Sequence, residues 1–212
     1  MSVVEFSDVV VTYDGYPALA GASVHIEAGT IVLVRGENGA GKSTLLRTIA
    51  GLMPIERGTA RVLDYDLSED RHVLRSRIGM LSHRNGLFMD LTARDNVEFW
   101  ARCVGAGSSD VDDALDRMRL GRELSSARVS TLSAGQRRRV ALAALVVRRA
   151  ELWLLDEPHS GLDEQSRRDL DATLTEASSV GATIVVSSHD TDRVARFAHA
   201  TVTLVSGRTT ES

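Results

Sequence analysis

The residues at positions 36–44 carry the clearest chemistry in this sequence. They run Gly-Glu-Asn-Gly-Ala-Gly-Lys-Ser-Thr and match the pattern GxxxxGK(S/T) between a predicted strand and a predicted helix. In this pattern, glycines let backbone N–H groups converge on phosphate oxygens, and the helix N-terminus adds its partial positive charge. Lys42 would reach the β and γ phosphates of a nucleoside triphosphate, and the Ser43 hydroxyl would bind Mg²⁺. The residues expected to hold the phosphates are Gly36, Asn38, Gly39, Ala40, Gly41, Lys42, Ser43 and Thr44.

The only lysine of the chain lies in this loop. The sequence has 25 lysine and arginine residues, and all except Lys42 are arginine. Such a bias suggests that arginine is used wherever charge alone is needed. A compact ammonium on a slim stem enters a site enclosed by backbone, whereas a planar guanidinium does not. The alternative is a glycine-rich turn that merely begins a helix, and the lysine favours the phosphate-binding loop.

Two acidic residues end the apolar stretch Trp153-Leu-Leu-Asp156-Glu157. Open α/β sheets bind ligands at the carboxyl ends of their strands, so Asp156 would hold the magnesium shell beside the phosphates. Glu157 would polarise the attacking water. The alternative is that the two acids only mark where a buried strand leaves the core; the glycine loop favours the catalytic interpretation.

The segment Leu132-Ser-Ala-Gly-Gln136 precedes a helix with a predicted apolar face between residues 140 and 147. Ser133 and Gln136 have the spacing of a capping box, which by itself needs no ligand. Three arginines at 137–139 follow in or near the first turn, where exposed cations oppose the helix dipole by roughly 0.3–1 kcal/mol each. A bound anion at this helix end would offset that conflict.

These residues need a particular order of strands and helices. Patterning predicts strands at 3–12, 31–35, 77–82, 152–155, 183–187 and 201–205, and helices at 43–51, from 92 onwards, 110–119, 163–177 and after Asp190. Strands that alternate with helices indicate an α/β fold with a mainly parallel sheet. Residues from about 86 to 130 are more polar and helical, which indicates an inserted subdomain within a single domain spanning 1–212.

Composition excludes several classes of function. The net charge of −4 and the pI near 5.9 give no reason to expect a nucleic-acid partner. Cys103 is the only cysteine, so an internal disulfide is excluded. The start, MSVVEFSDVV, lacks the features of a secretory signal, and the apolar stretch at 140–147 is far shorter than the roughly 20 residues that cross a bilayer. Any membrane role would therefore depend on a partner.

Taken together, the motifs resemble the ABC ATPase family over nearly the whole chain. The segment 132–136 is similar to that family's LSGGQ signature, and Ser160-Gly-Leu-Asp163 is similar to its D-loop. His189 resembles the switch histidine, and Tyr13 lies where an aromatic usually stacks on adenine. Alone, His189 would be a structural histidine at a strand end and Tyr13 a core or edge aromatic, so the order of the motifs carries the resemblance.

The resemblance implies an ABC-type P-loop NTPase fold with an N-terminal antiparallel β region and a helical insertion. It implies ATP and Mg²⁺ as cofactors, and a dimer with a second copy or another ATPase subunit. Each ATP would lie between the glycine loop of one chain and the signature of the other. ABC transmembrane subunits would hold this dimer at the cytoplasmic face of the inner or plasma membrane. The implied roles are catalysis for Lys42, Glu157 and His189, metal binding for Ser43 and Asp156, and nucleotide contacts for Tyr13, Ser133, Gly135, Gln136 and Asp163.

His83 departs from the family pattern. Members usually carry a glutamine there, which contacts the metal and links the site to the membrane subunits. An imidazole can also ligate or form hydrogen bonds, so His83 is a further metal candidate. The alternative is a histidine in a surface loop.

The stretch 132–163, together with His83, is similar to the haem-exporter ATPases of cytochrome c maturation. In that system ATP hydrolysis is thought to release a haem-loaded chaperone from a membrane complex. Another ABC exporter for lipids, drugs or polysaccharide would share every motif. A soluble ABC protein of translation or DNA repair usually has tandem cassettes or a long coiled coil, which this chain lacks. A subunit that binds ATP without catalysis conflicts with the intact catalytic residues.

Overall fold

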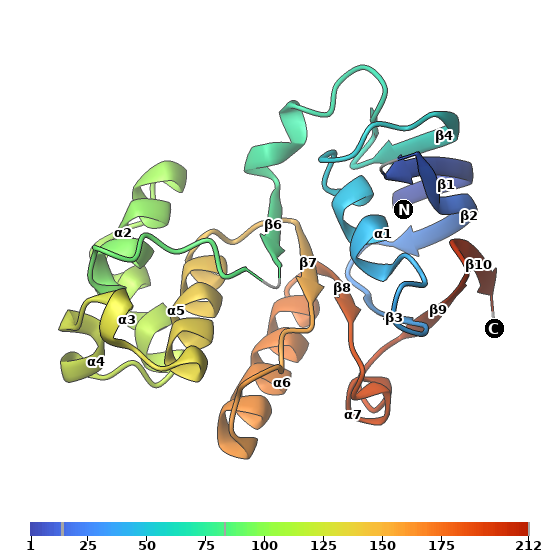
Figure 1. Cartoon of the computed structure of the whole chain (residues 1–212). Coiled ribbons are helices and arrows are strands. Elements are labelled where there is room, and N and C mark those ends of the chain that lie inside the picture. Colours follow the sequence, from blue (N-terminus) through green and yellow to red (C-terminus); the bar gives the residue numbers. More distant parts are fainter. Residues whose placement is uncertain (14, 83, 212) are drawn as a thin grey trace.

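The computed structural model describes residues 1–13, 15–82 and 84–211, so the candidate His83 lies outside the described residues. Strands of two sheets alternate with helices along the chain (Figure 1). The strands are β1 (Ser2–Tyr13), β2 (Tyr16–Glu27), β3 (Ile31–Arg35), β4 (Arg57–Val62), β5 (Tyr65–Asp66), β6 (Ile78–Leu81), β7 (Leu152–Asp156), β8 (Thr183–Ser187), β9 (Ala200–Val205) and β10 (Arg208–Glu211). The α-helices are α1 (Lys42–Ile49), α2 (Ala93–Val104), α3 (Ser108–Arg117), α4 (Arg122–Ser126), α5 (Ala134–Val147), α6 (Glu164–Ser179) and α7 (Thr191–Ala195).

The larger sheet has the strand order β10-β9-β3-β8-β7-β6. Its strands from β9 to β6 pair in parallel, and β10 joins the edge antiparallel to β9. Strands β7 and β8 are buried along their whole length, as expected for parallel strands covered on both faces. The predicted α/β fold with a mainly parallel sheet is therefore confirmed.

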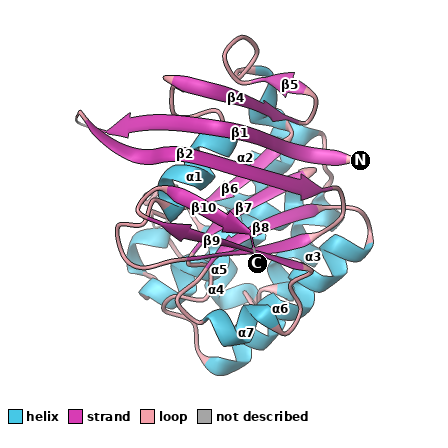
Figure 2. Ribbon diagram, turned by 90° about the vertical axis from the view of Figure 1, so that its right-hand side faces the viewer, coloured by secondary structure: helices cyan, strands magenta, loops and turns pink. Residues whose placement is uncertain are grey.

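The smaller sheet is antiparallel, with the order β2-β1-β4-β5. Figure 2 shows it as a separate layer over the edge of the larger sheet. The antiparallel N-terminal region implied by the family resemblance is thus confirmed. Pattern analysis of residues 16–27 missed β2, because this strand is rich in alanine and carries few of the bulky residues that favour strands.

The larger sheet separates two hydrophobic cores. Ile31 and Leu33 of β3 pack into a core formed with helices α2, α3, α5 and α6, whereas Val32 and Val34 pack into a core with α1 and the antiparallel sheet. Side chains alternate between the two faces of a strand, so one short strand supports both layers. Figure 1 shows these layers on opposite sides of β3, β7 and β8.

Helix α5 is more deeply buried than its predicted apolar face. The predicted face consists of Val140, Ala143, Ala144 and Val147, and all four are buried. Ala141, Leu142, Leu145 and even Arg138 are buried as well. The helix lies between the sheet and the layer of α2 and α3, so solvent reaches little of its surface. Periodicity alone gave one face because it does not reveal a second covering layer.

Helices α2, α3 and α4 lie within the stretch 86–130. Helix α2 begins with a capping box of Thr92 and Asp95, whose spacing in the sequence is typical of a helix N-terminus. Helix α3 begins two residues earlier than predicted, at Ser108. Because α5 packs on α2 and α3, the helical layer also includes residues beyond 130. The division of the chain into one domain with an insertion at 86–130 stays a prediction. Within the described residues, no helix is long and apolar enough to cross a membrane.

Strand β6 approaches α5 too closely for a side chain at Gly79. A Cβ there would lie 2.4 Å from Leu145 Cδ1 and 3.3 Å from Ala150 Cβ. We expect Gly79→Ala to lower the free energy of unfolding by about 1–3 kcal/mol, because the added methyl overpacks a closed core. Urea unfolding monitored by circular dichroism measures this loss.

Leu145→Ala provides the control for this prediction. The truncation opens the space that the new methyl needs, so Gly79→Ala should cost clearly less in the Leu145→Ala background than in the native chain. Equal losses in both backgrounds would show that the contact with Leu145 is not the cause.

Candidate nucleotide-binding and catalytic site

The loop between β3 and α1 is formed by glycines that have no room for side chains. Gly41 has a φ of 106°, and a Cβ there would lie 2.6 Å from the carbonyl oxygen of Ala18 in β2. A Cβ at Gly36 would lie 2.4 Å from the carbonyl oxygen of Leu204 in β9. The loop is therefore wedged between strands of both sheets, and its backbone is fixed before any ligand binds.

Lys42 is buried inside this loop. Its Nζ donates hydrogen bonds to the carbonyl oxygens of Gly36, at 2.7 Å, and Glu37, at 3.0 Å, and the residue is only 8% exposed. The ammonium thus lies within the ring of backbone where the sequence pattern places phosphate. Such an enclosure suits a compact cation and excludes a planar one, in agreement with the exception that Lys42 makes in composition.

Asp156 joins three elements at the carboxyl edge of the sheet. Its Oδ2 accepts a hydrogen bond from the Ser43 hydroxyl at 2.7 Å, and its Oδ1 accepts one from the Ser187 hydroxyl at 2.6 Å. A hydroxyl and a carboxylate are hard oxygen ligands of the kind that Mg²⁺ prefers, and the remaining positions would be filled by phosphate and water. No cluster of three histidine, cysteine or acidic residues occurs in the part of the chain that the structure describes, so phosphate oxygens would be needed to complete such a site.

Ser187 was missed by the sequence analysis. It ends β8 two residues before His189, in the stretch 183–187 that was predicted only as a strand. A polar residue at the end of an otherwise apolar buried strand was the available signal.

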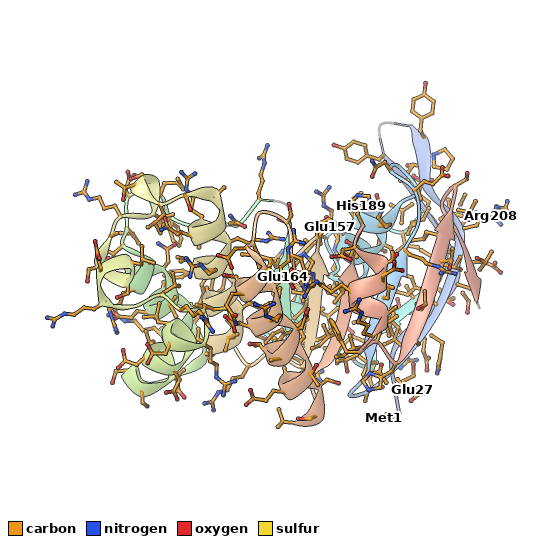
Figure 3. All side chains as sticks on the ribbon, turned by 90° about the horizontal axis from the view of Figure 1, so that it is seen from below. Met1, Glu27, Glu157, Glu164, His189 and Arg208 are labelled. Carbon is orange, nitrogen blue, oxygen red and sulfur yellow. The ribbon has the colours of Figure 1, made fainter. Side chains whose placement is uncertain are left out.

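Glu157 and His189 lie next to each other (Figure 3), and Glu157 directly follows Asp156 in the sequence. Glu157 Oε2 accepts a hydrogen bond from the His189 backbone N–H at 3.2 Å, and Oε1 lies 3.6 Å from His189 Nε2. Oε1 is buried and has no hydrogen-bond partner among the residues that the structure describes. Glu157 also has a φ of 50°, a strained conformation that costs on the order of 1–3 kcal/mol and is concentrated at functional sites. An unpaired carboxylate oxygen of this kind is available to accept from water.

The signature segment and the D-loop line one cleft of about 310 Å³. A Cβ at Gly135 would lie 2.6 Å from the carbonyl oxygen of Gly161, so the two segments touch through glycine. Ser133 caps α5 by accepting from the Gln136 backbone N–H at 3.2 Å, and Gln136 Oε1 accepts from the Ser133 backbone N–H at 2.8 Å. Four residues that the family resemblance assigns to nucleotide contacts line this cleft: Ser133, Gly135, Gln136 and Asp163.

Asp163 is the N-cap of α6. Its Oδ1 accepts a hydrogen bond from the Ser166 backbone N–H at 2.7 Å, and this bond lowers the pKa of Asp163 below its usual value. The carboxylate is therefore charged at neutral pH and available at the edge of the signature cleft.

A second cleft of about 550 Å³ lies along the glycine loop, against β9 and the start of α7. It is lined by residues 36–40 together with Thr191 and residues 203–206. The two clefts share no lining residue. Within one chain, the glycine loop and the signature segment therefore do not form a common site.

The arginines at 137–139 are stabilised differently from the sequence-based expectation. Arg137 Nε donates to the carbonyl oxygen of Leu132 at 2.9 Å, and Arg139 donates to the carbonyl oxygen of Arg119 at 3.2 Å. Arg138 donates to acceptors from other segments. Carbonyl oxygens thus offset the cations at this helix end, and no bound anion is required. Most of these partners are distant in sequence and were not visible in the local pattern.

Tyr13 is 59% exposed at the end of β1, which excludes the interpretation as a core aromatic. It pairs across the hairpin with Tyr16, which is 78% exposed. Strand β2 continues from Tyr16 to Ala18, which contacts the glycine loop. Tyr16 is therefore a second candidate for stacking on a base, and sequence analysis did not single it out. The role of Tyr13 stays a prediction.

Comparison with known proteins identifies the family of this chain. The sequence profile described as "ABC transporter" matches residues 19–160. The chain belongs to the ABC transporter ATPase family. The solved ATP-binding cassette MJ0796, a dimer in a post-hydrolysis state bound to ADP and Pi, matches with a TM-score of 0.89 and 27% identity over 97% of this chain and 96% of that chain.

Curated relatives of this ABC ATPase serve different transporters. The "Cytochrome c biogenesis ATP-binding export protein CcmA" of Mesorhizobium japonicum is 38% identical over 175 residues, 82% of this chain and 86% of the relative. The "Phosphonates import ATP-binding protein PhnC" of Trichormus variabilis is 35% identical over 97% of this chain and 91% of its own length. The prediction of an ATP-binding and ATP-hydrolysing ABC transporter subunit is confirmed, and these names leave the transported species open.

We expect Lys42→Arg to abolish tight ATP binding or turnover. The guanidinium is wider than the ammonium and does not fit between the carbonyl oxygens of Gly36 and Glu37. Nucleotide affinity measured by fluorescent ATP analogue titration, together with phosphate release, tests this. Arg47→Lys, an exchange on the exposed face of α1, should leave both unchanged. A fully active Lys42→Arg protein would contradict the enclosure argument.

Proposed function

We propose that this ABC ATPase works as a dimer on ABC transmembrane subunits at the cytoplasmic face of the inner or plasma membrane, and that it drives haem export or haem-chaperone release in cytochrome c maturation. Five relatives at 35–38% identity carry cytochrome c biogenesis in their names and support this assignment. A different ABC exporter is the alternative, supported by the "Nod factor export ATP-binding protein I" of Paraburkholderia xenovorans, which is 31% identical over 98% of this chain and 69% of the relative.

The catalytic part of the proposal rests on Oε1 of Glu157, the residue that follows Asp156. This oxygen has no hydrogen-bond partner in the described part of the chain. Mg²⁺ held by Ser43 and Asp156 would supply positive charge to the β and γ phosphates. Glu157 orients a water molecule and accepts its proton while the water oxygen attacks the γ phosphorus. The bond between this phosphorus and the oxygen of the leaving ADP breaks, giving ADP and phosphate. His189, beside Glu157, hydrogen-bonds the γ phosphate.

The separation of the two clefts supports dimerisation. The glycine-loop cleft and the signature cleft have different lining residues, and each chain has one of each. A second subunit that presents Ser133 and Gly135 to the bound γ phosphate would close both sites. The solved dimer of a cassette with the same fold supports this arrangement. A lone chain should therefore hydrolyse ATP slowly.

A membrane partner would also explain an exposed group of apolar side chains near the start of α2. Phe88, Met89, Leu91 and Phe99 are each at least 40% exposed. The rings of Phe88 and Phe99 pack edge to face with centroids 5.1 Å apart. Clustered exposed apolar side chains mark contact surfaces more often than isolated ones do. These residues are the proposed contact for the transmembrane subunits.

Glu157→Gln should bind ATP, lose turnover by roughly a hundredfold or more, and accumulate as a dimer with ATP. The amide keeps the size of the side chain but cannot accept the proton from water. Phosphate release and size-exclusion chromatography with and without Mg-ATP measure the two effects. Turnover near that of the native protein would assign the proton acceptor elsewhere.

The haem assignment predicts that the chain, purified with its natural membrane partners, carries a haem-bound chaperone. Addition of Mg-ATP should release this chaperone, and the same complex with Glu157→Gln should retain it. Haem absorbance in the released and retained fractions is the measurement. Co-purification of unrelated membrane subunits without haem would favour another exporter and leave the ATPase mechanism intact.

A further inference from the structure

We propose that Arg138 is a positioning residue for ATP hydrolysis. Its guanidinium connects the backbone of Glu157 with Ser82 and Asn85, which lie between β6 and α2. The inference rests on the proposed catalytic role of Glu157. Arg138 lies in the second turn of α5, and its side chain points away from the signature cleft into the interior.

The guanidinium of Arg138 binds acceptors from two segments at once. Nη2 donates to the carbonyl oxygens of Asp156, at 2.8 Å, and Glu157, at 2.7 Å, and Nε lies 3.4 Å from that of Pro158. Nη1 donates to the carbonyl oxygen of Ser82 at 2.7 Å and to Asn85 Oδ1 at 3.0 Å. A guanidinium has five N–H donors, so these five acceptors use its full capacity.

This cation is buried without a direct carboxylate partner among the described residues. Arg138 is 5% exposed, and desolvation lowers its pKa to about 10, so the group stays charged at neutral pH. Burying a charge is unfavourable unless hydrogen bonds satisfy it. An apolar side chain at this position would leave these carbonyl oxygens without their donors, so the guanidinium stabilises the arrangement of all five acceptors.

The hydrogen bonds of Arg138 stabilise the strained backbone at Glu157. Three successive carbonyl groups, at residues 156–158, point toward one guanidinium, although adjacent carbonyl dipoles repel one another. On the other side, the Glu157 backbone N–H donates to the carbonyl oxygen of Ser187 at 3.0 Å. Arg138 and Ser187 thus hold the positive φ of Glu157 between them and direct its carboxylate toward His189.

The second set of acceptors connects this backbone to the rest of the protein. Ser82 and Asn85 lie between β6 and the exposed aromatic residue Phe88. The N-cap of helix α5 is the signature residue Ser133. A shift of Ser82 and Asn85, or of α5, would therefore move the group that holds Glu157.

The test is Arg138→Lys in the full-length chain, with ATP turnover measured under saturating and limiting ATP. An ammonium has three donors and cannot span both sets of carbonyls, so kcat should fall about tenfold or more while KM changes less than about threefold. Arg137→Lys is the matched control, since Arg137 makes one backbone hydrogen bond and should keep its kcat. A kcat of Arg138→Lys within threefold of the native value, or a loss explained by KM alone, overturns the proposal.

A double variant shows whether Arg138 acts through Glu157. The residual turnover of Glu157→Gln should be unchanged when Arg138→Lys is added, because the group being positioned is already inactive. A further loss equal to that of Arg138→Lys alone overturns the proposal. If Glu157→Gln is itself fully active, the proposed function fails instead, so the two failures are distinguishable.

A milder variant distinguishes a loss of positioning from a loss of folding. Asn85→Ala removes one acceptor and leaves the buried carbonyls in place. If Arg138→Lys does not fold, Asn85→Ala should still lower kcat by more than about twofold with KM unchanged, and an unchanged kcat overturns the proposal.

Discussion

The carboxylate of Asp156 connects three segments at the carboxyl edge of the larger sheet. It accepts hydrogen bonds from Ser43 at the start of α1 and from Ser187 at the end of β8. Three segments that are far apart in sequence meet at one 7% exposed side chain. Because both oxygens of the carboxylate are engaged, the position of the glycine loop relative to β7 and β8 is set by the protein alone. A nucleotide therefore binds to a prepared edge of the sheet.

The features predicted well from sequence are those fixed by local chemistry. Strands β3 and β8 were predicted to the residue because short apolar runs bounded by turn residues have few alternatives. The cap of α2 at Thr92 follows from its spacing to Asp95. The glycine loop was identified because its pattern leaves almost no other backbone arrangement, and the site roles assigned to its residues stay predictions.

The features that were missed depend on contacts between distant segments. The burial of α5 on several sides results from a second layer of helices, and the hydrogen bonds of Arg138 reach residues 18–20 and 53–56 positions away along the chain. Ser187 becomes significant only beside Asp156. None of these partners has a signal in the local pattern, since a hydrogen bond between chain segments is decided by topology. Sequence analysis therefore found the motifs but not the side chains that hold them in register.

One half-buried carboxylate on α6, that of Asp171, connects the turns that follow Glu157 and His189. His159, which is 3% exposed, follows Glu157 by two positions, and its Nε2 lies 2.8 Å from Asp171 Oδ1. The other oxygen of Asp171 accepts from Arg193 of α7. Arg193 also pairs with Asp190 at 3.5 Å, directly after His189. The turn that follows Glu157 and the turn that follows His189 are thus tied to the same helix, so the distance between the two catalytic candidates is kept by α6 and does not rely on their own 3.6 Å contact.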